Sequence, residues 1–202
     1  VLKHAGINLL WRDNDGGCKG ACDRVPHTDM TQWNLDQFCK DKSCIDDVNF
    51  YRLDNVLDGL KQDTVLVIHL MGSHGPAYYR RYPDNFRKFT PTCDTNEIQD
   101  CDHQALMNTY DNTILYTDSV VSKTIDALKA RQSTLNTALV YLSDHGESLG
   151  ENGLYLHGTP YMLAPEQQTH IPFIFWLSKD YQQNFGVDAQ CLRDQAAKEA
   201  VS

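Results

Sequence analysis

The sequence of 202 residues lacks long hydrophobic runs and large basic clusters. No apolar stretch approaches the about 18 residues that a transmembrane helix needs, so we expect no membrane span within it. The N-terminus lacks the basic and apolar pattern of a signal peptide. Lys and Arg number 18 against 27 Asp and Glu. This balance argues against nucleic acid as a partner, because binding to phosphates needs clustered positive charge. The close basic residues Arg80-Arg81 and Arg87-Lys88 are interpreted as a solvated surface.

The sequence also lacks internal repeats, low-complexity tracts and linker-like segments. Its length is sufficient to bury a sizeable core. Apolar residues make up 41% and charged residues 22%, which is ordinary for a soluble globular protein. We therefore predict a single domain over residues 1–202.

None of the seven cysteines has Cys-x-x-Cys spacing, which weakens the alternative of a cysteine-rich metal site. Six of them form three close pairs in polar, loop-like sequence: Cys18 with Cys22, Cys39 with Cys44, and Cys93 with Cys101. We interpret the pairs as disulfides, each contributing about 2 kcal/mol by restricting the unfolded chain. Disulfides indicate an oxidising compartment. Cys191 either pairs with a cysteine outside this sequence or is a free thiol.

Hydrophobic periodicity predicts strands that alternate with helices. We expect strands at 7–11, 64–71, 137–142 and 170–177, and helices at 30–38, 51–60, 104–131 and within the tail 184–202. The helix at 104–131 has apolar residues at spacings of three, four and seven, as an amphipathic crossover helix does. The strand at 64–71 is apolar throughout, which is typical of a strand with both faces buried. The alternation predicts an α/β fold with a mostly parallel sheet and helices on both faces.

The stretch Ser-Asp-His-Gly-Glu-Ser-Leu-Gly at 143–150 directly follows the predicted strand 137–142. Such a strand brings Asp144 and His145 to the carboxyl edge of the sheet, where open α/β sheets place their active sites. A carboxylate oxygen and an imidazole nitrogen side by side suit Zn²⁺. The alternative is a capped turn, in which Asp144 accepts hydrogen bonds from backbone N–H groups.

His74 and His157 also lie in glycine-flanked loops. Because loops at one edge of a sheet can converge, we expect these two histidines to lie near His145. The other histidines are interpreted as ordinary surface or core residues: His4, His27, His69, His103 and His170.

The segment Asp144-His145-Gly146-Glu147-Ser148-Leu149-Gly150 resembles the metal-binding signature of the alkaline phosphatase and sulfatase superfamily. With the string through Gly158, and with Trp11-Arg12-Asp13-Asn14 and His74-Gly75-Pro76-Ala77-Tyr78 upstream, it is similar to one branch. That branch is the phosphoethanolamine–lipid A transferases, including the mobile colistin-resistance enzymes. The resemblance covers nearly the whole chain and implies an alkaline phosphatase/sulfatase-like fold.

The resemblance implies that Asp144 and His145 bind the catalytic zinc. It implies that His74 and His157 line the substrate pocket, where they can bind phosphate, the leaving group or a second zinc. Glu147 would orient His145 by accepting its hydrogen bond. The alternative for Glu147 is a solvent-exposed carboxylate.

The resemblance also implies a polar and basic group in the loop that follows Trp11. Lys19 and Asn14 would contact a phosphate oxygen or the ethanolamine region of the substrate. The alternative for Lys19 is an ordinary surface lysine.

The activity that the resemblance implies is zinc-dependent transfer of phosphoethanolamine from a phospholipid, phosphatidylethanolamine, to a lipid A phosphate. It would proceed through a phosphothreonine intermediate, in the periplasm, in a protein of the bacterial inner membrane. Added positive charge on lipid A would weaken the binding of polymyxins such as colistin. The alternatives are a metal-dependent phosphodiesterase or sulfatase of the same superfamily, and a non-catalytic fragment.

The nucleophile in the family is a threonine activated by zinc, and no threonine of this sequence matches its motif. No Glu matches the acidic zinc ligand on the family's first strand. We therefore expect the C-terminal portion of a catalytic domain, truncated at the N-terminus, with little or no turnover by itself. Membrane contact would come through the missing N-terminal region. An unpaired sheet edge would favour homo-association.

Overall fold

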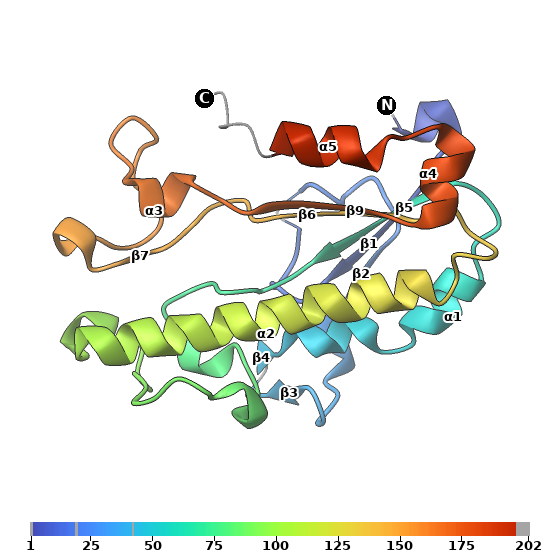
Figure 1. The fold of residues 1–202 in the computed structure, drawn as a ribbon. Helices are drawn as coiled ribbons and strands as arrows, with labels where there is room; N and C mark the ends of the chain where they lie inside the picture. Colours follow the sequence, from blue (N-terminus) through green and yellow to red (C-terminus); the bar gives the residue numbers. More distant parts are fainter. Residues whose placement is uncertain (1, 19, 42, 197–202) are drawn as a thin grey trace. The chain divides into compact units, whose positions relative to one another are not determined.

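The computed structural model describes all residues except 1, 19, 42 and 197–202 (Figure 1). The chain, predicted as one domain, forms two compact units. Unit 1 comprises Val1–Val120 and Glu147–Gly158, and unit 2 comprises Val121–Gly146 and Thr159–Ser202.

Unit 1 contains a parallel three-stranded sheet in the order β2-β1-β5. Its strands are β1 (Asn8–Asp13), β2 (His27–Asp29) and β5 (Thr64–His69). The register pairs Asp13 with His69, so the two strands end side by side with polar residues at their carboxyl edge. Strand β1 continues two residues beyond its predicted end. The predicted burial of both faces of β5 is only partial, since its residues are half-buried or exposed.

The helices of unit 1 are mostly short. Helix α1 (Leu53–Asp58) lies within its predicted range, whereas the predicted helix 30–38 forms only the 3₁₀ turn η2 (Met30–Trp33) because Asn34 adopts a left-handed conformation. The remaining 3₁₀ turns are η1 (Leu2–Ala5), η3 (Asp46–Phe50), η4 (Tyr78–Arg80), η5 (Asp84–Phe86), η6 (Ile98–Asp100) and η7 (Glu151–Gly153). Two small hairpins pair β3 (Cys39–Lys40) with β4 (Ser43–Cys44) and β7 (Ser148–Leu149) with β8 (Tyr155–Leu156).

The long helix predicted at 104–131 is α2 (His103–Lys129), which begins in unit 1 and ends in unit 2. Its buried residues contribute to two apolar clusters of unit 1. Ala105 and Leu106 pack with Tyr78, and Tyr116 and Val120 pack with Tyr82. The periodic face of the helix therefore forms much of the core of this unit.

All three predicted disulfides are present: Cys18–Cys22, Cys39–Cys44 and Cys93–Cys101. All three lie in unit 1. Cys191 is an exposed free cysteine, which agrees with one of the two possibilities predicted for it.

Unit 2 contains an antiparallel pair, β6 (Ala138–Leu142) and β9 (Phe173–Leu177), so the parallel arrangement expected from the sequence does not hold here. The register places Val140 opposite Phe175 and Leu142 opposite Phe173, on one face. These four side chains are 46 to 69% exposed, so this face of the pair is an exposed apolar surface. Besides the end of α2, unit 2 contains the helices α3 (Glu166–Thr169), α4 (Lys179–Phe185) and α5 (Ala189–Ala196).

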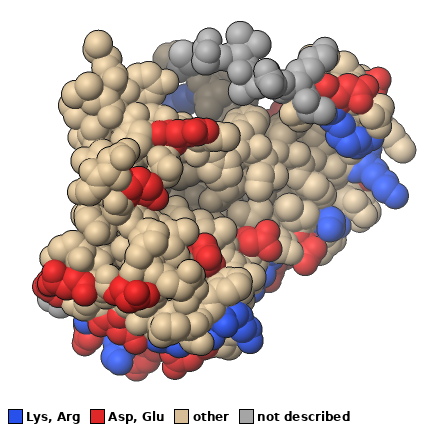
Figure 2. All heavy atoms as spheres, turned by 60° about the vertical axis from the view of Figure 1, so that its left-hand side comes forward, with Lys and Arg blue, Asp and Glu red and all other residues tan. Residues whose placement is uncertain are grey.

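Charged side chains of both signs are interspersed on the face shown in Figure 2, with Lys and Arg lying among Asp and Glu. Across the described part of the chain, no helix combines the length and the apolar composition needed to cross a bilayer.

Candidate functional site

Asp144 and His145 lie side by side just beyond the carboxyl end of β6. Oδ1 of Asp144 is 3.8 Å from Nε2 of His145. The Ser143 hydroxyl donates to the His145 carbonyl oxygen over 2.6 Å, which fixes the turn after the strand. Nδ1 of His145 is 3.0 Å from the Gly146 carbonyl oxygen. A proton on Nδ1 satisfies that carbonyl and leaves the lone pair on Nε2, the nitrogen nearer Asp144.

Gly146 allows this loop to lie against α3 of the same unit. Its N–H donates to the Gln168 carbonyl oxygen over 2.9 Å. A Cβ at position 146 would lie 2.0 Å from the Gln167 carbonyl oxygen, which is a backbone atom. The absence of a Cβ at Gly146 therefore allows one backbone segment to approach another closely.

The donor pair fits zinc. Zinc binds carboxylate oxygen and imidazole nitrogen at about 2.0 to 2.2 Å, so one ion can reach both atoms across 3.8 Å. The Asp144 side chain is 85% exposed. Because a turn cap would hold the carboxylate against backbone donors, this exposure disfavours the capped-turn interpretation.

His74 and His157 pack edge to face in unit 1, with ring centroids 4.8 Å apart. Buried Glu147 connects their loops. Its Oε1 accepts hydrogen bonds from the Gly75 N–H and from Nδ1 of His157, each over 3.1 Å. Its Oε2 accepts one from the Tyr78 hydroxyl over 3.1 Å. One carboxylate thus joins the 74–78 loop to the loop that carries His157.

The two histidines have the same hydrogen-bond pattern. Nδ1 of His74 lies 2.7 Å from the Gly75 carbonyl oxygen, and Nδ1 of His157 lies against the Glu147 carboxylate. A proton on Nδ1 satisfies both acceptors and leaves the lone pair of each ring on Nε2, as in histidines that bind metals. When protonated, the same nitrogen can donate to a phosphate oxygen. Burial, together with the Glu147 carboxylate, raises the pKa of Tyr78, so its hydroxyl remains a donor.

Glu147 was predicted either to orient a histidine or to be exposed. Only 7% of the residue is exposed, which excludes the second alternative. Its hydrogen bond to His157 fits the first, although the histidine expected to be oriented is His145, two residues earlier in the same loop.

The prediction that Asn14 contacts a substrate phosphate does not fit the structure. Asn14 is 1% exposed. Its amide donates to the Cys44 carbonyl oxygen and to Asp46, and its Oδ1 accepts from Asn49. Because its polar atoms form hydrogen bonds with other residues of unit 1, Asn14 stabilises the loop after β1. Lys19, the second residue predicted there, lies outside the described residues.

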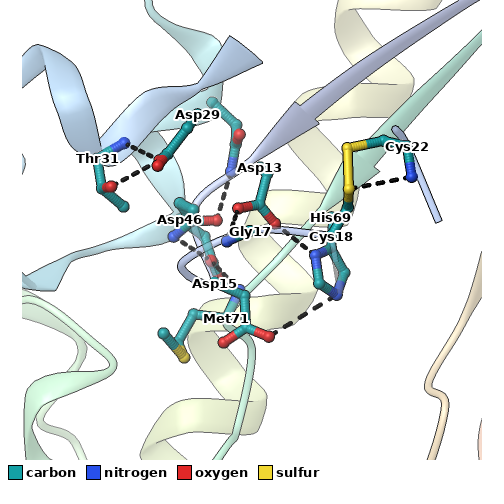
Figure 3. A network of polar contacts seen from close by, with 12 residues as sticks. Asp13, Asp15, Gly17, Cys18, Cys22, Asp29, Thr31, Asp46, His69 and Met71 are labelled. Carbon is teal, nitrogen blue, oxygen red and sulfur yellow. Dashed lines mark hydrogen bonds and ion pairs between the residues drawn. A yellow bond between two sulfur atoms is a disulfide. The ribbon is translucent and has the colours of Figure 1, made fainter. Parts of the chain in front are cut away.

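A second polar network occupies the carboxyl edge of β1 and β5 (Figure 3). Asp13 lies 2.5 Å from Nδ1 of His69 and accepts from the Gly17 N–H. Asp15 lies 3.8 Å from Nε2 of the same ring. His69, interpreted as a satisfied histidine, is thus held between two carboxylates. Neither Asp13 nor Asp15 was predicted from the sequence as a partner of His69; the register of β1 and β5 accounts for the contact of Asp13 alone.

Asp46 is a further acid of this network (Figure 3). It is fully buried and accepts hydrogen bonds from the Met71 and Gly72 N–H groups, in the loop that follows β5. Burial raises the pKa of Asp46. It lies in a loop-like stretch of sequence with no motif that could have singled it out.

The structure therefore brings together two pairs of predicted residues, each within its own unit. His74 and His157 lie together in unit 1, and Asp144 and His145 lie together in unit 2. Chain connectivity places Glu147 two residues after His145.

The family model described as "Sulfatase" matches residues 1–202. Phosphoethanolamine transferase EptA of Salmonella typhimurium is 60% identical over 197 residues, which are 98% of this chain and 36% of the relative. Phosphatidylethanolamine transferase Mcr-2 of Escherichia coli is 42% identical over 183 residues, covering 87% of this chain and 34% of the relative. The chain thus spans little more than a third of the curated relatives it matches.

Solved structures of phosphoethanolamine transferases also match the chain. The integral membrane protein lipooligosaccharide phosphoethanolamine transferase A from Neisseria meningitidis matches with a TM-score of 0.95 and 50% identity, covering 98% of this chain and 37% of that chain. The periplasmic domain of EptC from Escherichia coli, in complex with Zn, matches with a TM-score of 0.70 and 26% identity, covering 94% of this chain and 54% of that chain. These matches confirm the predicted sulfatase-like α/β fold.

Proposed function

The chain belongs to the sulfatase family, and we propose from that premise that it is part of a zinc-dependent phosphoethanolamine transferase. The donor would be phosphatidylethanolamine and the acceptor a phosphate of lipid A. The observation that carries the proposal is the Asp144–His145 pair beyond the end of β6, in a chain 60% identical to a transferase of that name.

Asp144 and His145 would hold the zinc, with further ligands from outside this sequence, because catalytic zinc sites usually have three protein ligands. When bound, zinc stabilises negative charge on the phosphoryl group and activates the hydroxyl nucleophile. His74 and His157 would bind phosphate oxygens or the leaving group, or a second zinc, through Nε2. Glu147 would keep the His157 ring in the required orientation and tautomer.

The nucleophile in this proposal is the threonine that the family resemblance implies, contributed by a segment outside this sequence. The threonine oxygen would form a bond to phosphorus as the bond to the lipid oxygen breaks. The lipid A phosphate would then displace the threonine oxygen. We accordingly propose that the 202-residue chain has little or no turnover by itself.

We also propose a periplasmic location, in a protein anchored to the bacterial inner membrane by a segment outside this sequence. Three disulfides support an oxidising compartment. The similarity to an integral membrane transferase supports the anchor. Such an enzyme would reduce the binding of polymyxins by adding positive charge to lipid A.

Two alternatives remain to be tested. A phosphodiesterase or sulfatase of the same superfamily would transfer the group to water, and a non-catalytic fragment would bind metal or headgroups weakly. The names of the similar proteins favour the transferase.

The test measures zinc content and headgroup release in a chain extended toward the N-terminus. Asp144→Ala and His145→Ala are expected to lose both, whereas Asp118→Ala, at an exposed acid of α2, is expected to retain both. Retention of zinc and activity in the first two variants would contradict the metal assignment. Turnover by the 202-residue chain would contradict the assignment of the nucleophile to an outside segment. Release of phosphoethanolamine to water, with none transferred to lipid A, would favour the hydrolase.

A further inference from the structure

Three consecutive large apolar side chains project into solvent between β8 and α3. Tyr161 is 85% exposed, Met162 94% and Leu163 75%. The next most exposed large apolar residue of the described chain is Phe173, at 69%. Figure 1 shows the segment that leads into α3 as an open loop. We call Tyr161-Met162-Leu163 the apolar tip.

The apolar tip belongs to a structured turn. The Leu163 N–H donates to the Pro160 carbonyl oxygen over 2.7 Å, and the Ala164 N–H donates to that of Tyr161 over 3.4 Å. At the base of the loop, the Thr159 N–H donates to Oε1 of Gln168 over 3.3 Å. The backbone is thus bonded internally while the three side chains point outward.

Buried Gln168 also connects the apolar tip to the proposed zinc pair, within unit 2. Its side chain accepts from Thr159 at the base of the loop, and its carbonyl oxygen accepts from the Gly146 N–H, next to His145. The tip is therefore held at a defined position relative to Asp144 and His145.

The chemistry of the segment suits the interface of a lipid bilayer. No charged residue lies between Gly158 and Pro165, so insertion would bury no charge. Leu163 and Met162 would gain from leaving water. Tyr161 has an apolar ring and a polar hydroxyl, as residues at membrane interfaces do.

We propose that the apolar tip inserts into the interfacial layer of a phospholipid bilayer and so presents the Asp144–His145 pair to lipid headgroups. This rests on the proposed function, which supplies a lipid substrate. A bilayer is favoured over a protein partner because a stable protein interface buries about 600 Å² or more on each side, usually over 20 to 30 residues, whereas the apolar tip has three residues. The similarity to a protein described as an integral membrane protein also supports a bilayer as the partner of the tip.

The test is cosedimentation of the 202-residue chain with vesicles of phosphatidylcholine and phosphatidylethanolamine. These lipids are zwitterionic, so the net charge of -9 does not repel the chain from them. The variant Tyr161→Ser/Met162→Ser/Leu163→Ser is expected to lower the partition coefficient at least tenfold. The control is Phe185→Ser, at a 62% exposed residue of the same unit. It is expected to stay within twofold of the parent chain.

A second measurement tests directly whether the apolar tip lies in the bilayer. Met162→Trp fluorescence is expected to be quenched by vesicles with brominated acyl chains, and that of Phe185→Trp is not. Absence of vesicle binding by the parent chain, undiminished binding by the triple variant, or unquenched Met162→Trp would each overturn the proposal. If the parent chain formed dimers without vesicles and the triple variant did not, the tip would instead be a contact between copies.

Failure of this proposal can be distinguished from failure of the proposed function. In the extended chain, the triple variant is expected to release headgroups from a water-soluble short-chain phosphatidylethanolamine at the parent rate, but to be slower on vesicles. Equal losses on both substrates would overturn the tip proposal. Vesicle binding is measured without turnover, so it is informative even if the chain proves to be part of a different enzyme.

Discussion

Glu147 illustrates how one buried side chain can determine the state of another. It accepts three hydrogen bonds, from Gly75, Tyr78 and His157. Glu147→Gln retains the shape but replaces one acceptor oxygen with an NH₂ donor. We expect a loss of about 1 to 3 kcal/mol in the free energy of unfolding, because a buried donor is left unsatisfied.

The measurements are urea unfolding and the ¹⁵N chemical shifts of the His157 ring, which report whether Nδ1 keeps its proton. Glu166→Gln is the control, since Glu166 is exposed and its pairing with His170 contributes little. An unchanged tautomer of His157 in Glu147→Gln would show that Glu147 does not set it.

Asp46 provides a prediction of pH dependence. Burial raises its pKa, opposed by hydrogen bonds from Asn14, Met71 and Gly72 and by the charge of Arg81. Folding therefore favours the protonated carboxyl. The stabilising contribution of that form is complete below the ordinary carboxyl pKa of about 4 and is lost as pH rises through the raised value.

We accordingly expect the unfolding free energy of the parent chain, relative to Asp46→Asn, to fall as pH rises from about 4 toward neutrality. Urea unfolding at a series of pH values measures this difference. Asp63→Asn, at an exposed site, is expected to show none. A difference that grew with pH would mean that the hydrogen bonds to the carboxylate outweigh its burial.

Among the structural elements, the contact between α3 and the loop that carries Asp144 and His145 depends on Gly146. Gly146→Ala would bring a Cβ within 2.0 Å of a backbone oxygen, so the loop must move. We expect a loss of about 1 to 3 kcal/mol in stability and weaker zinc binding. Gly59→Ala is the control, because its φ of -82° suits alanine and its Cβ would lie 3.1 Å, not 2.0 Å, from the nearest backbone oxygen. Urea unfolding measures the change in stability, and calorimetric titration measures the change in zinc affinity. An unchanged zinc affinity would show that this loop contact does not position the zinc ligands.

The exposed face of the β6–β9 pair predicts self-association of the isolated chain. Val140, Leu142, Phe173 and Phe175 are at least 46% exposed there, and such apolar strand surfaces associate. Phe173→Ser/Phe175→Ser should shift sedimentation toward the monomer, whereas Phe89→Ser, at another exposed apolar site, should not. A parent chain that stays monomeric at high concentration would contradict this prediction and the homo-association expected from the sequence.

For the whole molecule, the disulfides distinguish the two units. The three bonds close loops within unit 1, and each contributes about 2 kcal/mol. We expect a reductant to destabilise unit 1 much more than unit 2. Hydrogen exchange with and without reductant measures the two separately, and the matched Cys→Ser variants should be insensitive to it. Equal loss of protection in both units would show that they unfold together.

Features that depend on neighbouring residues were predictable from the sequence alone. The disulfides join cysteines 4 to 8 positions apart, Asp144 and His145 are adjacent, and the periodicity of α2 lies within one element. The superfamily signature is equally local. Sequence reasoning succeeded here because the partners belong to the same short segment.

What only the tertiary structure decided was burial and long-range pairing. Glu147 accepts a hydrogen bond from Gly75, 72 residues away in the sequence. The buried amide of Asn14 donates a hydrogen bond to Asp46. One face of the β6–β9 pair remains exposed. Periodicity shows that a strand is apolar without showing which element covers it. Likewise, the type of a polar residue shows what it can bind, whereas its partner depends on how distant parts of the chain fold together.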